Sequence, residues 1–318
     1  MKRLTLSLLL GLVCINIQAQ VVERFIDHTS YLASDELMGR GTGSKSIHVA
    51  AEYIAEQFQN VGLKPYRDDS YLQSFAIPGV SERESNVIGV LAAKTNTNRS
   101  IVFTAHYDAY GVVDGEIYNG ARDNAIGVAA LIELARSFEQ DGAPDQNLVF
   151  IATAAEEGGQ DGIRYYVNNP LYPLDEITIN INIDGFNVSG PREDYFVMPR
   201  QGVNFIDKIE VVASSLGWSY VSPEWIDGLN TSFDTSTFLW HGIPAFTLWT
   251  GDQIKGEEID PTPEFGFIHT ADDEINETWN WGGVEDHLML YKAIAEYFIQ
   301  NPSGISVTDK NLFYTPSE

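Results

Sequence analysis

The sequence predicts an α/β fold, a three-layer αβα sandwich in which helices cover both faces of a mostly parallel, mixed central sheet. Two observations predict it. Short apolar or β-branched runs alternate along the chain with segments of helical periodicity. Residues 148–152 also form an almost continuous apolar run, as expected for a strand buried on both faces. The chain has 318 residues, 44% of them hydrophobic, and no internal repeat, so we expect one domain over residues 20–318.

Residues 1–19 have the pattern of a secretory signal peptide. A basic start at residues 1–3 precedes a short apolar run, and Ala19 is a small residue at a plausible cleavage point. The single cysteine, Cys14, lies inside this segment, and Val13 before it is unlike the small residue that usually precedes a lipidated cysteine. We therefore expect cleavage after Ala19 and a secreted or periplasmic protein without disulfides or a membrane anchor.

The elements of the predicted sandwich follow from local patterns. Residues 45–61 carry apolar side chains at helical spacing, and Gly62 suits the position after the last turn. The glycine-rich segment 37–43 follows no strand, so it predicts an irregular loop near a pocket rather than a phosphate loop. The other predicted helices are residues 127–138, 203–216 and 284–299. The predicted strands are residues 87–91, 101–105, 148–152, 177–183 and 243–249.

The charge balance narrows the classes of partner. The chain has 19 basic and 45 acidic residues, for a formal net charge of −26. Binding to nucleic acid or to an anionic membrane surface needs clustered lysine and arginine, so both are disfavoured as partners. An acidic protein of this kind is compatible with binding cations.

Histidines and acids gather where the predicted strands end. In open α/β sheets, sites form just beyond the carboxyl ends of the strands, so residues placed there are expected to converge. Five segments supply such residues: His106-Tyr107-Asp108, Asp123-Asn124 before a helix, Glu156-Glu157, Asp184-Gly185, and a loop with His269. The remaining histidines lack comparable carboxylate neighbours in the sequence and are expected to be structural: His28, His48, His241 and His287.

Imidazole nitrogen and carboxylate oxygen are ligands for zinc and its first-row neighbours. Burying several acids without a counter-charge would cost several kcal/mol for each, roughly, so divalent cations are expected among them. Two histidines and three carboxylates suit a pair of metal ions, with one carboxylate bridging and one histidine and one carboxylate completing each side.

Together these residues resemble the co-catalytic zinc aminopeptidases of metallopeptidase family twenty-eight. The resemblance covers nearly the whole chain after residue 19, and the stretch 32–43 with residues 51–54 is similar to bacterial members. It rests on His106-Tyr107-Asp108, residues 118–129, Glu156-Glu157, Asp184 and His269-Thr270. It implies the zinc-peptidase type of the αβα sandwich, with residues 20–318 as the catalytic domain.

The resemblance also implies a ligand set with two Zn²⁺ per chain. Asp123 would bridge the two ions. His106 and Asp184 would complete one zinc site, and Glu157 and His269 would complete the other. The substrate would be a peptide with a free N-terminus, and the products its N-terminal residue and a shortened peptide.

Two further roles follow from the resemblance. Glu156 would be the general base toward a zinc-bridging water, and Asp108 would orient the imidazole of His106. The chain departs from the family at Arg122, where an aspartate is frequent, which alters the charge at the rim of the site.

Three other functions are also considered for these residues. A glutaminyl cyclase has a similar fold but uses one zinc ion for acyl transfer. A carboxypeptidase of this fold would need a basic pocket for the terminal carboxylate, for which Arg122 or Arg164 is available. An inactive metal-binding scaffold would lack a ligand or the base, whereas all six positions are present here. The sequence predicts no particular oligomeric state.

Overall fold

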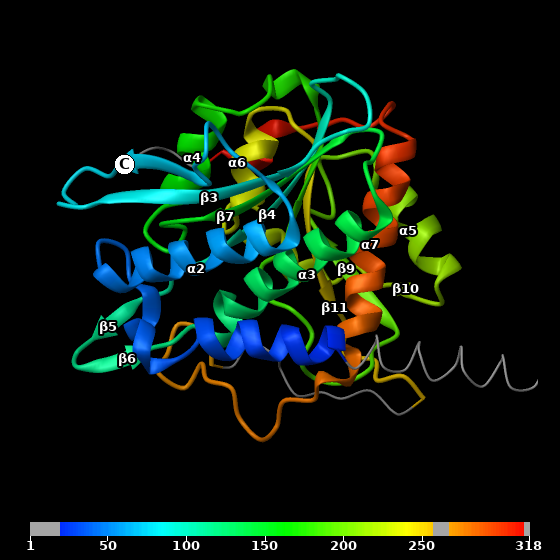
Figure 1. The fold of residues 1–318 in the computed structure, drawn as a ribbon. Helices are drawn as coiled ribbons and strands as arrows, with labels where there is room; N and C mark the ends of the chain where they lie inside the picture. Colours follow the sequence, from blue (N-terminus) through cyan, green and yellow to red (C-terminus); the bar gives the residue numbers. More distant parts are fainter. Residues whose placement is uncertain (1–19, 257–266, 315–318) are drawn as a thin grey trace, which may run out of the picture.

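A mixed sheet of nine strands forms the centre of the molecule (Figure 1). The computed structural model describes residues 20–256 and 267–314, so the predicted signal peptide at residues 1–19 lies outside the described residues. The strand order is β1-β3-β7-β4-β8-β11-β9-β10, and β2 pairs with β3. The strands are β1 (Lys64–Pro65), β2 (Leu72–Ala76), β3 (Arg83–Leu91), β4 (Ser100–His106), β7 (Asn147–Thr153), β8 (Ile177–Asn182), β9 (Asp194–Met198), β10 (Ser219–Tyr220) and β11 (Ala245–Thr250). A separate hairpin is made of β5 (Gly111–Val113) and β6 (Glu116–Tyr118).

The parallel strands lie in the middle of the sheet. Strands β7, β4, β8 and β11 run parallel to one another, whereas β3 and β9 pair antiparallel on either side of them. The carboxyl ends of the four central strands therefore meet at one edge of the sheet. The predicted α/β class and mixed sheet are confirmed, with the antiparallel pairs confined to the flanks.

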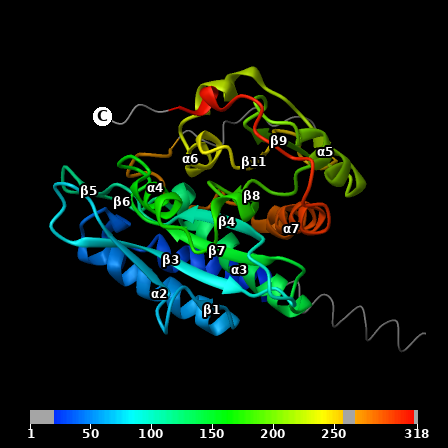
Figure 2. The same cartoon turned by 90° about the horizontal axis from the view of Figure 1, so that it is seen from above.

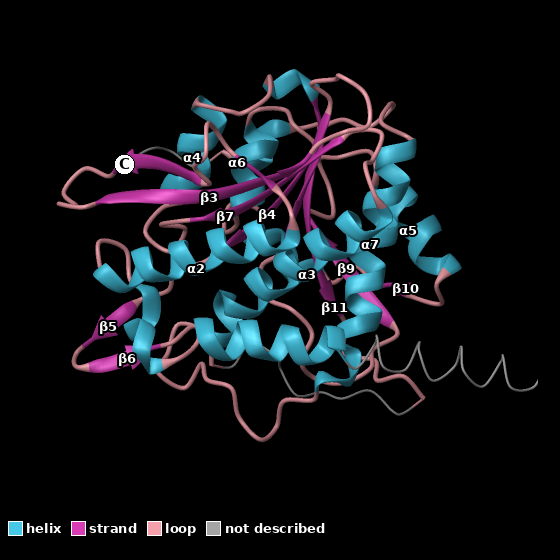
Figure 3. Ribbon diagram, viewed as in Figure 1, coloured by secondary structure: helices cyan, strands magenta, loops and turns pink. Residues whose placement is uncertain are grey.

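Helices cover both faces of the sheet, so that the strands run between two helical layers (Figure 3). One layer contains α2, α3 and α7, and the opposite layer contains α4 and α6 (Figure 2). The helices are residues 20–32, α2 (Lys45–Val61), α3 (Ile126–Asp141), α4 (Asp161–Asn168), α5 (Ile206–Ser215), α6 (Asp234–Trp240) and α7 (Val284–Gln300). Within the described ranges, none of the helices is both long and apolar enough to cross a membrane.

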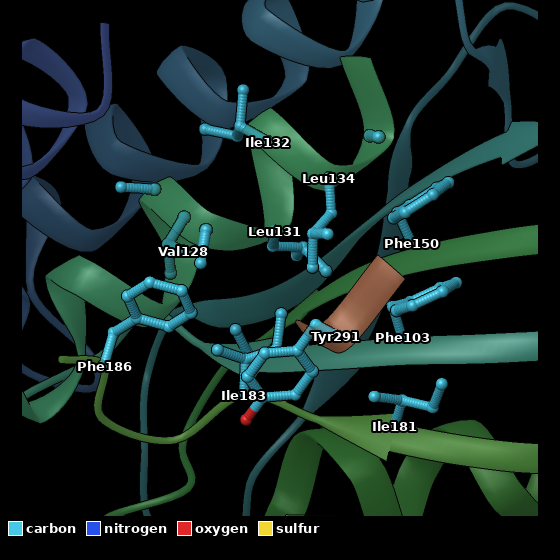
Figure 4. Packing of buried hydrophobic residues seen from close by; sticks show 14 of the residues in the cluster. Phe103, Val128, Leu131, Ile132, Leu134, Phe150, Ile181, Ile183, Phe186 and Tyr291 are labelled. Carbon is cyan, nitrogen blue, oxygen red and sulfur yellow. The ribbon is translucent and has the colours of Figure 1, made fainter. Parts of the chain in front are cut away.

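Alternation along the central strands divides the core into two parts. Phe103 of β4 and Phe150 of β7 stack at 4.9 Å and pack with α3 in one cluster (Figure 4). Their neighbours Val102 and Val149 point to the other face and pack with α4 and α6. Successive side chains of a strand alternate between faces, so a near-continuous apolar strand is needed where both faces are covered.

Most predicted elements agree with the structure. The predicted helix 45–61 has the bounds of α2, and Gly62 ends it with a φ of 96°, in the left-handed region. The predicted helix 203–216 is shorter in the structure, because Val203 pairs with Val307 in an isolated bridge before α5 begins. The two-residue strands β1 and β10, the hairpin β5–β6 and the short helices α4 and α6 were not predicted, because they are too short for a period to show.

Candidate metal centre

The predicted ligands come together at the carboxyl edge of the central strands. Two groups have ligand atoms within 4.8 Å of one another: His106, Asp123 and Asp184 form the first, and Asp123, Glu157 and His269 form the second. Asp123 belongs to both groups. The five predicted ligands are therefore clustered, in two sets that share one carboxylate.

The first group is built on strand ends. His106 is the last residue of β4, and Asp184 follows β8 by two residues. The Nε2 atom of His106 lies 3.0 Å from Oδ1 of Asp123 and 3.6 Å from Oδ1 of Asp184. The side chain of His106 is only 2% exposed. These ligand atoms are thus placed by the parallel pairing of β4 with β8.

The second group is built on loops. The Nε2 atom of His269 lies 2.8 Å from Oδ2 of Asp123 and 3.5 Å from Oε2 of Glu157. The side chain of His269 is 48% exposed, and its ring lies 4.9 Å from the ring of Tyr110. The two oxygens of Asp123 thus face different histidines, which is the geometry of a bridging carboxylate.

Asp108 connects the buried histidine to the segment that carries the predicted base. Its backbone carbonyl oxygen lies 3.2 Å from Nδ1 of His106, and its carboxylate lies 3.7 Å from the same atom. The carboxylate accepts hydrogen bonds from the backbone N–H groups of Glu156 (3.1 Å) and Glu157 (3.2 Å). A histidine ligand is usually oriented by such a contact on its second nitrogen. Here the main-chain carbonyl is the closer partner, and the carboxylate fixes the Glu156-Glu157 turn.

The segment that carries Asp123 is held by two side-chain acceptors, Asn124, which the sequence pointed to, and Asp273, which it did not. The carboxylate of Asp273 accepts hydrogen bonds from the backbone N–H groups of Arg122 (2.9 Å) and Asp123 (3.1 Å). On the other side, Oδ1 of Asn124 accepts hydrogen bonds from the N–H groups of Gly127 (3.1 Å) and Gly185 (2.8 Å). These contacts tie the segment of the shared carboxylate to the turn after β8. No sequence pattern marks Asp273, which lies in an irregular loop.

A fully buried arginine donates hydrogen bonds to backbone segments next to the site. Arg40, at the end of the 3₁₀ segment η1 (Asp35–Arg40), donates to the carbonyl oxygens of Tyr107 (2.7 Å), Asn119 (2.7 Å) and Gly120 (3.1 Å), and to that of Leu32. Burial lowers its pKa to about 10, against the opposing effect of nearby acids, and it remains a cation at neutral pH. The glycine-rich segment 37–43 was predicted to be an irregular loop near a pocket, but its buried arginine was not foreseen.

The electrostatics of the cluster fit a cation. Burial, together with the charge of Asp123, raises the pKa of Glu157 to about 8, and burial also raises the pKa of Asp184. Burial likewise raises the pKa of Glu156 well above its ordinary value. Oε1 of Glu157 is buried and has no hydrogen-bond partner in the described part of the chain. Because unpaired buried acids are costly, this donor set of imidazole and carboxylate fits zinc.

His106 and His269 lower the pKa of Asp123, whereas the pKa values of the neighbouring acids are raised. Burial alone would raise the pKa of Asp123, but the hydrogen bonds from His106 and His269 outweigh it and hold the pKa below its ordinary range. Burial likewise opposes the charged form of His106, and Asp184 with the other acids outweighs it, so the pKa of His106 is raised. Asp123 is therefore the carboxylate that stays ionised at the centre of the cluster.

A cavity of about 1110 Å³ opens over this cluster. The residues that line it include both candidate metal-ligand groups and Glu156. An aromatic wall stands beside them, in which Phe233 and Trp249 meet edge to face at 5.6 Å and the indole N–H of Trp249 donates to the carbonyl oxygen of Asp184. Arg122 and Arg164 also line the cavity. The space is large enough for several residues of a peptide.

The other histidines do not join the cluster, but one of them has a carboxylate neighbour that the sequence did not show. Nε2 of His28 lies 3.7 Å from Oε1 of Glu133, so the expectation that it lacks such company is wrong. Glu133 is also paired with Arg24 at 2.6 Å and Arg136 at 3.2 Å. Burial opposes its charged form, but the contacts with His28 and these arginines outweigh burial and lower its pKa to about 2. These cations satisfy the acid without a metal.

The chain is similar to a known protein family and to known proteins. The family model described as Peptidase family M28 matches residues 86–295. The alkaline phosphatase isozyme conversion protein of Escherichia coli is 29% identical over 140 residues, which are 39% of this chain and 39% of that protein. A probable zinc metalloprotease of Pyricularia oryzae is 31% identical over 147 residues, which are 40% of this chain and 29% of that protein. The matches thus span less than half the length of these relatives.

Solved structures share the fold. The zinc aminopeptidase BSAP from Bacillus subtilis has a TM-score of 0.52 and 25% identity, over 67% of this chain and 50% of that one. A leucine aminopeptidase precursor from Bacteroides thetaiotaomicron has a TM-score of 0.58 and 18% identity, over 88% of this chain and 95% of that one. The second likeness concerns the fold alone.

Proposed function

Because this chain belongs to peptidase family M28, we propose that it is a zinc-dependent aminopeptidase that removes N-terminal residues from peptides with a free N-terminus. The observation that carries the proposal is Asp123, whose two oxygens face His106 at 3.0 Å and His269 at 2.8 Å. A carboxylate shared in this way supports two Zn²⁺ per chain rather than one. We further propose, from the sequence of residues 1–19, that the protein is exported as a secreted or periplasmic enzyme.

Different residues of the chain have different roles in hydrolysis. Asp123 would be shared between two zinc ions, with His106 and Asp184 holding one of them and Glu157 and His269 holding the other. When bound, zinc supplies a Lewis acid that polarises the scissile carbonyl and lowers the pKa of the attacking water.

The Glu156 carboxylate takes a proton from the attacking water and later delivers it to the leaving amine. Burial raises the pKa of Glu156, so its carboxyl group is able to hold that proton between the two transfers. The Asp108 carboxylate accepts a hydrogen bond from the backbone N–H of Glu156 and so keeps that residue in place, and the backbone carbonyl of Asp108 contacts His106. The acidic floor of the cavity provides the negative charge that attracts a substrate ammonium group.

The decisive substitution is Glu156→Gln, assayed on a panel of aminoacyl nitroanilides with and without chelator. The glutamine matches the shape of the glutamate but accepts no proton, so kcat is expected to fall by about 10² to 10⁴-fold while the zinc content is unchanged. Metal analysis of the wild type and variant is expected to give two zinc ions per chain. Activity within tenfold of the wild type would show that Glu156 is not the base.

Three assays separate the proposal from its alternatives. A peptide and its N-acetylated form test whether the free amine is required, and cleavage of the acetylated form would indicate a carboxypeptidase instead. A peptide with N-terminal glutamine tests for ring closure, which together with one zinc ion per chain would indicate a glutaminyl cyclase. Loss of all nitroanilide hydrolysis in the zinc-loaded wild type would favour a scaffold.

A further inference from the structure

Arg164 lines the same cavity as the metal-ligand groups but has no role in the chemistry described above. It lies on α4, and its guanidinium makes no hydrogen bond or ion pair with another residue in the described ranges. The chain has 45 acidic residues against 19 basic ones. In such a chain, a cation that faces a cavity and lacks an acidic partner is available to an acidic ligand.

The wall of the cavity leads from the predicted base to this arginine. Glu156 and Glu157 are followed without a break by Gly158, Gly159, Gln160 and Asp161, all of which line the cavity, and α4 begins at Asp161. Arg164 follows three residues later, so it lies on the same helical face as Asp161 and about 4.5 Å further along the axis. Arg164 and Glu156 therefore line the same cavity and are eight residues apart in the chain.

The cavity fits a short peptide. An extended chain advances about 3.3–3.6 Å per residue, so one or two residues beyond the scissile bond fit within a cavity of about 1110 Å³. The acidic floor suits the ammonium group of such a peptide, and a guanidinium binds a carboxylate through paired N–H donors. A di- or tripeptide carries both charges within the one cavity, whereas a longer peptide presents neutral amides to the arginine.

We propose that Arg164 binds the α-carboxylate of the substrate, and that the enzyme acts preferentially on di- and tripeptides with a free C-terminus. This rests on the proposed aminopeptidase function and narrows its substrate class. Arg164 is then a specificity-determining residue that contacts the end of the substrate opposite to the one that is cleaved.

The test compares Leu-Gly-Gly as the free acid with Leu-Gly-Gly amide, which differs only in the terminal charge. For the wild type, kcat/KM is expected to be about tenfold or more higher for the acid, mainly through KM, because the charged pair forms with the acid alone. In Arg164→Gln this acid-to-amide ratio is expected to fall close to one. Each ratio is taken within one preparation, so partial loss of folded protein cancels.

Two further variants sharpen the result. Arg164→Lys keeps the charge and is expected to retain part of the preference. Arg99→Gln removes an arginine that lines a different cavity and is expected to leave the ratio at the wild-type value. Equal rates on acid and amide in the wild type, or an unchanged ratio in Arg164→Gln, would overturn the proposal.

Leucyl nitroanilide has no carboxylate and serves as the reference substrate for the wild type. If the zinc-loaded wild type cleaves it and shows no preference for the acid, Arg164 is misassigned and the aminopeptidase function stands. If it cleaves neither the nitroanilide nor the peptides, the aminopeptidase function itself fails, and the role of Arg164 fails with it.

Discussion

His106 and His287 are both buried, 2% and 0% exposed, yet their surroundings move their pKa values in opposite directions. Acids surround His106 at the edge of the sheet and raise its pKa although burial opposes the charge. His287, on α7, packs against the rings of Phe186 and Tyr291, and burial lowers its pKa to about 3. The comparison shows that burial alone does not separate the two histidines. Asp123 and Asp184 lie within 3.6 Å of Nε2 of His106, whereas aromatic rings surround His287.

The largest effect is expected from removing the carboxylate on which the acidic site depends. Asp123→Ala removes a ligand from both groups at once, so we expect kcat/KM to fall by more than about 10³-fold, as for the loss of several kcal/mol of metal stabilisation. Nitroanilide turnover with metal analysis measures it. The control substitution is His287→Phe, which lies among aromatic rings away from the acids. It is expected to leave turnover within a few-fold of the wild type. Similar losses in both variants would show that turnover depends no more on Asp123 than on the surroundings of His287.

A smaller effect is expected on metal-linked stability. Each zinc ion, at 100 times its Kd, is expected to stabilise the folded wild type by about 2.7 kcal/mol, because it binds the native state. His106→Ala is expected to lose most of this gain, and His287→Phe is expected to keep it. Thermal unfolding with and without zinc gives both values. A full zinc-dependent shift in His106→Ala would mean that the buried histidine is not a ligand.

The smallest effect concerns stability against pH. His287 has a pKa of about 3 in the folded chain and 6.5 as an ordinary histidine. As the pH falls below 6.5, the unfolded chain binds the proton first, so stability is lost progressively down to about pH 3. Between pH 7 and pH 5 this single group accounts for about 2 kcal/mol.

His287→Phe removes that contribution and is expected to flatten the dependence by this amount. Denaturant unfolding at pH 7 and pH 5, for wild type and variant, checks it. Parallel curves for the two proteins would show that His287 is not held neutral.

Local pattern accounts for the elements that were predicted. Residues 45–61 have enough helical turns for their period to be read, and residues 148–152 are apolar because both faces of β7 are covered. The short strands β9 and β10 form because they pair with neighbouring strands, and no hydrophobic periodicity in the sequence predicts them. Arg40 and Asp273 were missed for the same reason, since their partners are backbone groups of distant segments.

The sequence by itself determined which chemical groups stand at the ends of the strands, because strand periodicity and residue type are both local properties. From these it was possible to expect His106, Asp123, Glu157, Asp184 and His269 at one edge of the sheet, and the structure brings them together. The family resemblance implied that Asp123 is shared between two groups. Only the tertiary structure decided which oxygen of Asp123 faces which histidine, that His28 meets Glu133, and that two buried histidines have opposite pKa shifts. Such properties depend on distances of a few ångströms and on the loss of water around a charge, which the order of residues does not contain.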